Sequence, residues 1–320
     1  MRILVTGSAG HLGEALMRTL QGSEHEAIGL DIKGSQFTQA ISPITDRGFV
    51  RQCVRNVDVV LNAATLHKPH IASHTRQDFV DTNITGTLNL LEEAARAGVK
   101  AFVYTSTTST FGYALTPPAG QPAAWITEEV VPIPKNIYGV TKLAAENLCE
   151  LVHRNSGLPC IILRTARFFP EQDDDENVRG DYEDANLKVN EFLYRRADIE
   201  DVVSAHLLAM EKAAAIGFGR FIISATTPFA PGDVGELRKG APAVVRRYLP
   251  SYETEYERRG WSLMPSIDRV YVNERARTQL GWQPKYDFRY IIERLRASKD
   301  FRSPLAIAVG AKGYHAKGIG

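Results

Sequence analysis

The residues in this sequence that are most clearly suited to a chemical reaction are a tyrosine and a lysine four positions apart, Tyr138 and Lys142. At this spacing both side chains lie on one face of the helix predicted from about 137 to 155. A free phenol titrates near pH ~10 and is a poor base at neutral pH. A nearby ammonium group favours the phenolate, so Tyr138 could exchange a proton with a hydroxyl or carbonyl group. Taken alone, the pair could equally be an ordinary surface Tyr and Lys.

A second motif consists of three glycines near the N-terminus, Gly7, Gly10 and Gly13, spaced G-x-x-G-x-x-G. A predicted strand (residues 3–5) precedes them, and residues 14–20 have the apolar spacing of a helix. The first glycine permits a tight turn, the second lets the backbone approach a pyrophosphate, and the third lets the helix pack on the strand. Glycines also mark ordinary turns, but this strand–turn–helix context predicts dinucleotide binding.

The end of the next predicted strand indicates which dinucleotide is bound. Residues 26–30 are strand formers, and Asp31 follows them. A carboxylate at this distance from the glycine turn binds the ribose hydroxyls of the adenosine. It would repel a 2′-phosphate, so NAD is expected rather than NADP.

The segments that would position these residues alternate between strands and helices. Further strands are predicted at 57–61, 101–105, 160–163 and 218–224, and helices at about 75–97, 137–155 and 198–214. This alternation predicts an α/β fold with a Rossmann-type, doubly wound parallel sheet. We expect residues 1–169 to form the NAD(P)-binding domain, which also receives later segments from about 195 to 225.

Residues 170–320 lack this repeat and are expected to form a small C-terminal α/β lobe that binds substrate, followed by a tail. Short helices are predicted at 233–239, 243–248 and 287–297, and a strand at 270–272. The proline-rich stretch 117–134 and the acidic stretch 171–184 are both expected to be loops. The tail, 303–320, is expected to pack on something, such as a second subunit.

The overall composition excludes several classes of protein. Lys and Arg number 38 and Asp and Glu 37, so no basic field is expected to attract nucleic acid or an anionic membrane. The three cysteines, Cys53, Cys149 and Cys160, fit neither a metal site nor a disulfide framework. No apolar run approaches ~18 residues, and the first strand begins at the N-terminus. A cytoplasmic protein without a metal is expected.

Together the motifs resemble those of the extended short-chain dehydrogenase/reductases, the NAD-dependent epimerase/dehydratase group. The resemblance also rests on Asn62-Ala63-Ala64 and on residues 83–91, 104–112, 197–203 and 280–284. It implies that Thr107 is the catalytic hydroxyl residue, with Ser106 beside it, and that both act with Tyr138 and Lys142. Asn83 is implied to hold the active-site strand and helix together.

The resemblance also implies two sets of binding residues. The set for the cofactor is Gly7, Ala9, Gly10, His11, Leu12, Gly13, Asp31, Ile32, Ile44, Asn62, Ala63, Ala64, Asn83, Thr105, Tyr138 and Lys142. The set for the substrate is Thr65, Thr107, Thr108, Arg167 and Arg196. Among the histidines, His206 is expected to be structural.

Three positions depart from the pattern of this family. Thr108 and Ser109 stand where its dehydratases have an Asp-Glu pair, which disfavours dehydration. Pro43 replaces an acid that contacts the adenine, and Arg167 replaces an Asn that touches a substrate diphosphate. The segment from 170 to 195 is also short and acidic, which makes it a poor neighbour for a diphosphate.

The resemblance implies an enzyme that oxidises a hydroxyl of a sugar or nucleotide sugar with NAD, as an epimerase or as a dehydrogenase. A dehydrogenase of a free sugar or sugar acid is an alternative, favoured by Arg167 and the short segment. A non-catalytic regulator that senses a dinucleotide is an alternative of another class. A homodimer through the helices near 75–97 and 137–155 is expected.

Overall fold

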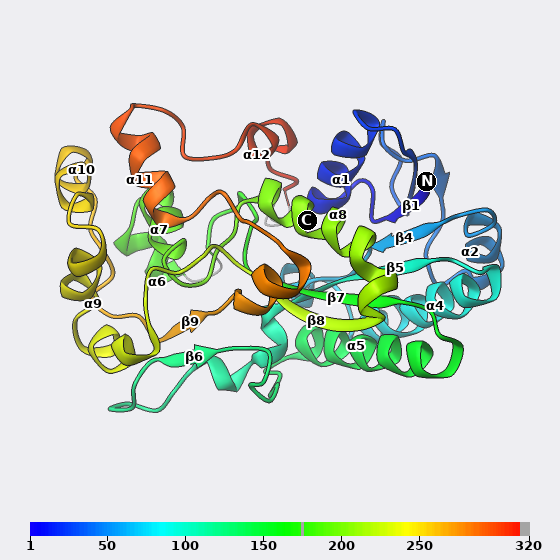
Figure 1. Cartoon of the computed structure of the whole chain (residues 1–320), viewed down its shortest axis with the longest axis horizontal. Helices are drawn as coiled ribbons and strands as arrows, with labels where there is room; N and C mark the ends of the chain where they lie inside the picture. The colour runs from blue at the N-terminus through cyan, green and yellow to red at the C-terminus, as the bar shows by residue number, and fades with distance from the viewer. Residues whose placement is uncertain (174–175, 314–320) are drawn as a thin grey trace.

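The computed structural model describes residues 1–173 and 176–313, and its centre is a seven-stranded parallel sheet. The strands run in the order β3-β2-β1-β4-β5-β7-β8, and the crossover between β1 and β4 is where the order reverses (Figure 1). Their bounds are β1 Arg2–Thr6, β2 Glu26–Asp31, β3 Ala40–Ile41, β4 Val59–Asn62, β5 Ala101–Thr107, β7 Cys160–Thr165 and β8 Phe218–Ile223. The predicted doubly wound sheet is confirmed.

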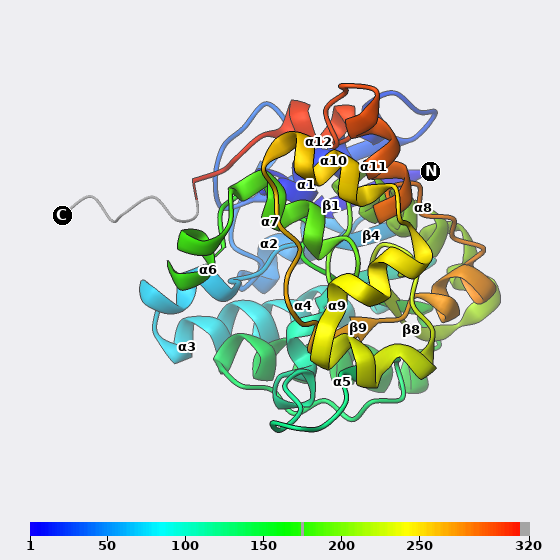
Figure 2. The same ribbon diagram turned by 90° about the vertical axis from the view of Figure 1, so that its left-hand side faces the viewer.

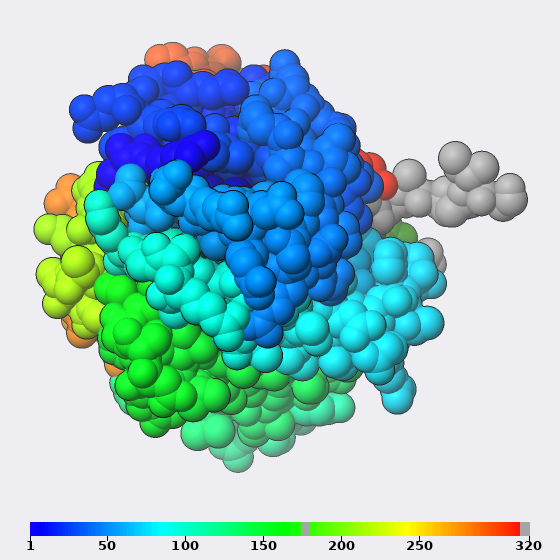
Figure 3. All heavy atoms as spheres, turned by 90° about the vertical axis from the view of Figure 1, so that its right-hand side faces the viewer, coloured from blue at the N-terminus to red at the C-terminus, as the bar shows by residue number. Residues whose placement is uncertain are grey.

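Helices cover both faces of this sheet. One face packs against α1 (His11–Gln21) and α8 (Ile199–Ile216), and the other against α2 (Arg47–Cys53), α4 (Gly86–Ala97) and α5 (Ile137–Ser156). The central strands are buried on both sides, which is why they read as continuous apolar runs rather than alternating ones. Figure 3 shows that the end of the molecule beside the N-terminus is formed by the first half of the chain, in blue to green.

A second lobe with its own apolar core lies at the opposite end of the sheet (Figures 1 and 2). Its helices are α7 (Asp184–Glu191), α9 (Val234–Tyr248), α10 (Tyr252–Arg259) and α11 (Phe288–Arg296). A two-stranded parallel sheet of β6 (Ala124–Ile126) and β9 (Arg269–Tyr271) belongs to this lobe. The lobe therefore takes one strand from the stretch 117–134, which was predicted to be a loop.

The predicted single helix at 75–97 is divided into three parts. A short α3 (Arg76–Phe79) leads into a π-helical turn (Val80–Thr85), and α4 follows. Asn83, in the wide turn, bonds to the loop after β4 and to α5, as described below. A π turn at this place is consistent with its frequent occurrence next to functional sites.

The acidic stretch 171–184 was predicted to be a solvated loop, and this prediction is wrong for its second half. A short helix α6 (Glu176–Asp181) and the start of α7 occupy it. Acids in the described part of this stretch are paired: Asp173 with Arg167 and Arg195, and Glu171 with His11. Composition alone predicts that such acids are solvated, because it does not show that their partners come from other parts of the chain.

The C-terminal segment returns to the part of the molecule that contains α1. Helix α12 (Pro304–Val309) packs against α1 and α8. Beyond it, Lys312 bonds through its backbone N–H to Glu171 (2.9 Å) and through its side chain to Glu14. The described part of the tail thus packs within this chain, and residues 314–320 lie outside the described residues.

Two negative findings concern the described residues. None of their helices combines the length and the apolar character needed to cross a membrane. Within residues 1–173 and 176–313, no three His, Cys, Asp or Glu side chains are grouped so that they could hold a metal ion.

Candidate active site

A cavity of about 850 Å³ runs along the carboxyl ends of the central strands, and we call it the main cavity. This volume is in the usual range for a small-molecule site, and the carboxyl edge of an open parallel sheet is where ligands bind. Most of the residues predicted to bind the cofactor line it: Gly7, Ala9, Gly10, His11, Leu12, Gly13, Asp31, Ile32, Ile44, Ala63, Ala64, Thr105, Tyr138 and Lys142.

The glycine turn after β1 is shaped so that side chains would not fit. Gly7 has a φ of +74°, and a Cβ there would lie 2.8 Å from the backbone nitrogen of Ala64. A Cβ on Gly13 would lie 1.9 Å from the carbonyl oxygen of Gly7. Helix α1 begins at His11 with no side-chain cap, so its first N–H groups face the main cavity. This cradle fits the pyrophosphate of a dinucleotide.

Asp31 lies at the end of β2 and lines the same cavity. Its Oδ2 accepts a hydrogen bond from the backbone N–H of Ala9 at 3.0 Å, and its Oδ1 accepts one from Lys33 at 2.9 Å. These bonds hold the carboxylate beside the glycine turn and leave acceptor capacity on both oxygens. The geometry therefore fits the binding of ribose hydroxyls.

Two residues of the predicted cofactor set, Asn62 and Asn83, do not line the main cavity. The side chain of Asn62 accepts a hydrogen bond from Thr6 at 2.7 Å, inside the sheet. Asn83 accepts from the backbone N–H of Leu66 (2.8 Å) and donates to the hydroxyl of Thr141 in α5 (3.0 Å). Both asparagines thus bond to protein groups that surround the cavity.

Tyr138 and Lys142 lie in the first turns of α5 and both line the main cavity. Helix α5 can approach the end of β5 closely because residue 139 is glycine, where a Cβ would lie 2.9 Å from the carbonyl oxygen of Ser109. This close approach places Tyr138 near enough to Thr107 for the Thr107 side chain to lower the pKa of the phenol. Both side chains are almost fully buried.

The lysine is directed at the strand rather than at the phenol. Its Nζ donates to the carbonyl oxygen of Thr105 at 2.6 Å and lies 4.2 Å from the ring centroid of Tyr104. Burial lowers the pKa of Lys142 to about 7. Burial raises the pKa of Tyr138 to about 12, against the opposing effect of the hydrogen bond with Thr107. Burial therefore outweighs any effect of Lys142 on the pKa of Tyr138, and the expectation that Lys142 and a positively charged nicotinamide together lower this pKa stays a prediction.

Ser106, predicted beside Thr107, lines the main cavity, but its hydroxyl is bonded to a buried carboxylate. It donates to Glu146 at 2.5 Å, and Glu146 forms a buried ion pair with Arg164 (2.8 Å). Successive side chains of a strand point to opposite faces, so Thr105 bonds to His206 of α8 while Ser106 bonds to α5. The hydroxyl of Ser106 is thus committed to the core.

The residues predicted to bind substrate are divided between two places. Thr65, Thr107, Thr108 and Arg167 line the main cavity. Arg167 is paired there with Asp173 (2.8 Å). Arg196 does not line the main cavity: it is 4% exposed, and it pairs with Glu191 at 2.6 Å and bonds to the carbonyl oxygen of Phe169. Arg196 instead holds the C-terminal end of α7 through Glu191, the last residue of that helix.

Several lining residues were not predicted from the sequence. Arg195, Arg269 and Tyr271 come from the second lobe, and Lys312 comes from the C-terminal segment. No local pattern marks Arg269 or Tyr271, because only the pairing of β9 with β6 brings them to the cavity. Arg195 directly precedes Arg196 in the sequence, and it is Arg195 that lines the main cavity.

His67 forms part of the cavity wall and is stacked on Phe169, with ring centroids 5.3 Å apart and 13° between the planes. Burial, assisted by the nearby His70 and His11, lowers the pKa of His67 to about 3. The ring is therefore neutral at physiological pH. It contributes shape and hydrogen bonding rather than positive charge.

Comparison with known proteins gives a family match over most of the chain. The family described as "NAD dependent epimerase/dehydratase family" matches residues 3–223. A UDP-glucose 4-epimerase of Lactobacillus helveticus is 24% identical over 321 residues, covering 90% of this chain and 93% of that protein. A dTDP-glucose 4,6-dehydratase of Streptomyces niveus is 33% identical over 193 residues, 54% of this chain and 55% of that protein.

Two further matches complete the comparison. An uncharacterised protein of Sinorhizobium fredii is 32% identical over 167 residues, which is 50% of this chain and 39% of that protein. Among solved structures, a short-chain dehydrogenase/reductase superfamily protein from Agrobacterium tumefaciens with bound NAD superposes with a TM-score of 0.66. It is 21% identical, and the match covers 93% of this chain and 97% of that one, so it supports the fold.

Proposed function

Because this chain belongs to the NAD dependent epimerase/dehydratase family, we propose that it oxidises a hydroxyl group of a sugar or nucleotide sugar with NAD. The observation that carries the proposal is the contact between Tyr138 and Thr107 in the cavity that the glycine turn also lines. A relative named as a UDP-glucose 4-epimerase, aligned over nine-tenths of this chain, supports a sugar as the substrate.

In the proposed mechanism Thr107 and Tyr138 hold one substrate hydroxyl between them. The Thr107 hydroxyl orients the substrate oxygen, and Tyr138 takes the proton from it as the carbonyl forms. NAD, when bound, supplies the acceptor for the hydride from the same carbon. The side chain of Lys142 is held by its hydrogen bond to the carbonyl oxygen of Thr105. When Lys142 is protonated, its positive charge favours the phenolate form of Tyr138.

Among the reactions of this family, we favour a net dehydrogenation over epimerisation and dehydration. Thr108 and Ser109 offer hydroxyls where the elimination of water would need a carboxylate pair. Pro43 lines the adenine side of the cavity and offers no side-chain hydrogen bond there, at a cost of roughly 0.5–1.5 kcal/mol in cofactor binding. Weaker binding of the cofactor suits an enzyme that releases NADH in each cycle.

The test is to purify the protein, measure bound NAD after dialysis, and follow NADH absorbance with a panel of sugars, sugar acids and UDP-sugars. We expect little retained cofactor and a rise in absorbance with at least one compound. Stoichiometric NAD after dialysis, with interconversion of a UDP-sugar and no free NADH, would establish an epimerase instead.

A non-catalytic regulator that senses the dinucleotide is the second candidate. It would explain the glycine turn and Asp31 but gives no reason for a buried Tyr138–Thr107 contact, which costs desolvation of two hydroxyls. NAD binding without turnover of any panel compound, and without an effect of Tyr138→Phe on any measured property, would favour this candidate.

We also propose a cytoplasmic homodimer in which residues 1–169 bind NAD and the lobe from 170 onward binds substrate. The cysteines Cys53, Cys149 and Cys160 are all free, as is usual in a reducing compartment. Val140 and Leu151 are 48% and 45% exposed on one face of α5, which suits a dimer contact. Light scattering should give twice the monomer mass, and Val140→Glu should halve it.

A further inference from the structure

The part of the main cavity that belongs to the second lobe contains two arginines that the proposed chemistry does not use. Arg195 follows α7, and Arg269 begins β9. Their side chains are only 20% and 15% exposed, and both line the cavity together with Tyr271. The charge of Arg195 acts on the charge of Arg269, so the two residues that line this part of the cavity also affect each other electrostatically.

Each of the two guanidinium groups is only partly satisfied. Nη2 of Arg195 donates to Glu191 (2.6 Å) and Asp173 (3.3 Å), and Nη1 of Arg269 donates to Asp268 (2.9 Å). The Nε atoms of both arginines are buried and have no acceptor in the part of the chain that the structure describes. Among residues 1–173 and 176–313, no hydrogen bond is recorded for Nη1 of Arg195 or Nη2 of Arg269. A guanidinium has five N–H donors, so both arginines keep donor capacity for an acceptor in the cavity that they line.

The ion pairs around this point indicate what kind of group the acceptor is. Arg167 and Arg195 share Asp173, and Arg269 pairs with Asp268. The carboxylates paired with them are Asp173, Glu191 and Asp268. The arginines thus favour an anionic group beside them, and a planar carboxylate matches the fork of a guanidinium.

We propose that Arg195 and Arg269, with the hydroxyl of Tyr271, bind a carboxylate group of the substrate, which is therefore a sugar acid. This inference rests on the proposed oxidation of a sugar hydroxyl at Tyr138 and adds the chemical class of the substrate. Arginine forks recognise planar carboxylates through paired, charge-assisted hydrogen bonds. Such a contact would fix which end of the sugar lies in the second lobe and so which hydroxyl reaches Tyr138.

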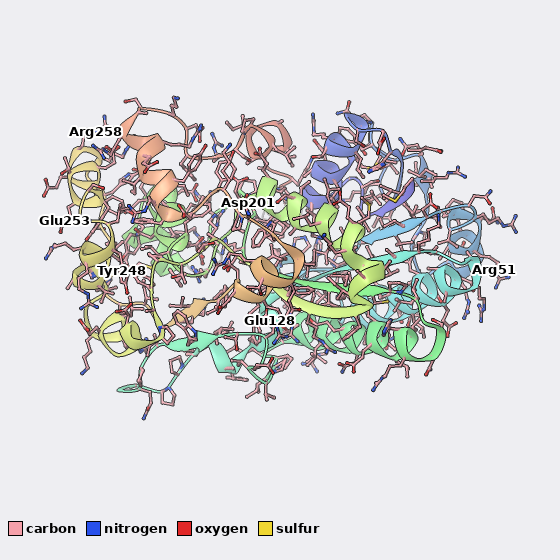
Figure 4. All side chains as sticks on the ribbon, in the orientation of Figure 1. Arg51, Glu128, Asp201, Tyr248, Glu253 and Arg258 are labelled. Atoms are coloured by element: carbon pink, nitrogen blue, oxygen red, sulfur yellow. The ribbon has the colours of Figure 1, made fainter. Side chains whose placement is uncertain are left out.

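The test uses Arg269 because Arg195 also holds Glu191 and Asp173 in place. The variants are Arg269→Gln and Arg269→Lys, and Arg51→Gln is the matched control. Arg51 pairs with Glu93 on the far end of the molecule (Figure 4). Binding to the NAD-loaded protein is measured by calorimetry for a series of hexuronates and aldonates, for the corresponding neutral sugars, and for glucose 6-phosphate. KM and kcat are measured for every compound that is oxidised.

We expect at least one sugar acid to bind more tightly than its neutral counterpart. Arg269→Gln should weaken that binding and raise its KM by roughly 10- to 100-fold, with little change in kcat or in the binding of neutral sugars. Arg269→Lys should recover part of the loss, since it restores the charge without the fork, and Arg51→Gln should behave as wild type. The lysine variant also serves as the test if the glutamine variant does not fold.

Three results would overturn the inference. One is that no sugar acid binds better than its neutral counterpart. Another is an equal loss for acid and neutral sugars in Arg269→Gln. The third is tighter, Arg269-dependent binding of glucose 6-phosphate, which would assign the site to phosphate.

The inference and the proposed function can fail separately. Oxidation of neutral sugars alone would overturn the carboxylate site and leave the proposed function intact. Arg269-dependent binding of a sugar acid that is never oxidised would support the carboxylate site and contradict the proposed function.

Discussion

Replacing Tyr138 with phenylalanine removes one hydroxyl from the main cavity and is the sharpest test of the proposed chemistry. Burial raises the pKa of this phenol to about 12 in the ligand-free protein. At neutral pH the phenolate then lies roughly 7 kcal/mol above the phenol, because each pKa unit corresponds to about 1.4 kcal/mol. Substrate, cofactor and Lys142 must offset most of this difference for Tyr138 to act as a base.

Loss of a positioned general base costs typically about 10²- to 10⁴-fold in rate. We expect a decrease of this size in kcat/KM for Tyr138→Phe. The wild-type rate should rise with pH until the phenol of the complex is ionised, and the variant should lose this rise. NAD affinity should change less than about threefold, because the phenol is proposed to act in proton transfer and not in holding the pyrophosphate at the glycine turn.

The matched control is Tyr113→Phe, which deletes the same atom from a ring that is 62% exposed. NADH formation is followed between pH 6 and 10 for wild type and both variants, and NAD binding is measured by calorimetry. Thermal melting checks the fold, and the loss of one hydrogen bond should lower the free energy of unfolding by about 1 kcal/mol. Turnover of Tyr138→Phe within a few-fold of wild type, with the same pH profile, would refute the assignment of the base.

Three further predictions concern the cofactor and the fold. Asp31→Ala should shift the preference from NAD towards NADP by about tenfold or more, because the carboxylate repels a 2′-phosphate; an unchanged ratio of the two dissociation constants would contradict this. Gly13→Ala should destabilise the protein by several kcal/mol in urea titrations, since its Cβ would lie 1.9 Å from the carbonyl oxygen of Gly7, whereas Gly235→Ala, with nothing within 4 Å, should be neutral or stabilising. Burial raises the pKa of Asp201 to about 7, so the folded state holds a proton there that the unfolded state has lost above pH ~4. The stability contributed by this group is therefore greatest below pH ~4 and is lost as the pH rises through 7. Between pH 5 and pH 8 the urea midpoint of unfolding should fall less in Asp201→Asn than in wild type. An equal fall in both proteins would contradict this prediction.

The features that sequence alone predicted well depend on neighbours along the chain. The glycine spacing describes a turn whose shape is set within a few residues, and Asp31 ends the adjacent strand. Tyr138 and Lys142 share a face because helical periodicity places residues four apart together. Apolar runs buried on both faces predicted the strands of the parallel sheet, because no distant information is needed to recognise them.

What the sequence could not supply is the partner of each polar side chain. Ser106 and Thr107 are adjacent and chemically alike, and only the strand's orientation sends the first to buried Glu146 and leaves the second with Tyr138. The sequence predicts that the acids near 171–184 are solvated, whereas in the fold Asp173 pairs with Arg167 and Arg195.

The second lobe shows the same limit most clearly. Arg269 and Tyr271 reach the main cavity because β9 pairs with β6, a strand more than 140 positions earlier in the chain. That pairing buries an apolar lobe, so its free energy comes from the whole core rather than from residues near the site. Local sequence thus determined the glycine turn, Asp31 and the shared face of Tyr138 and Lys142, whereas tertiary packing decided which arginines line the main cavity.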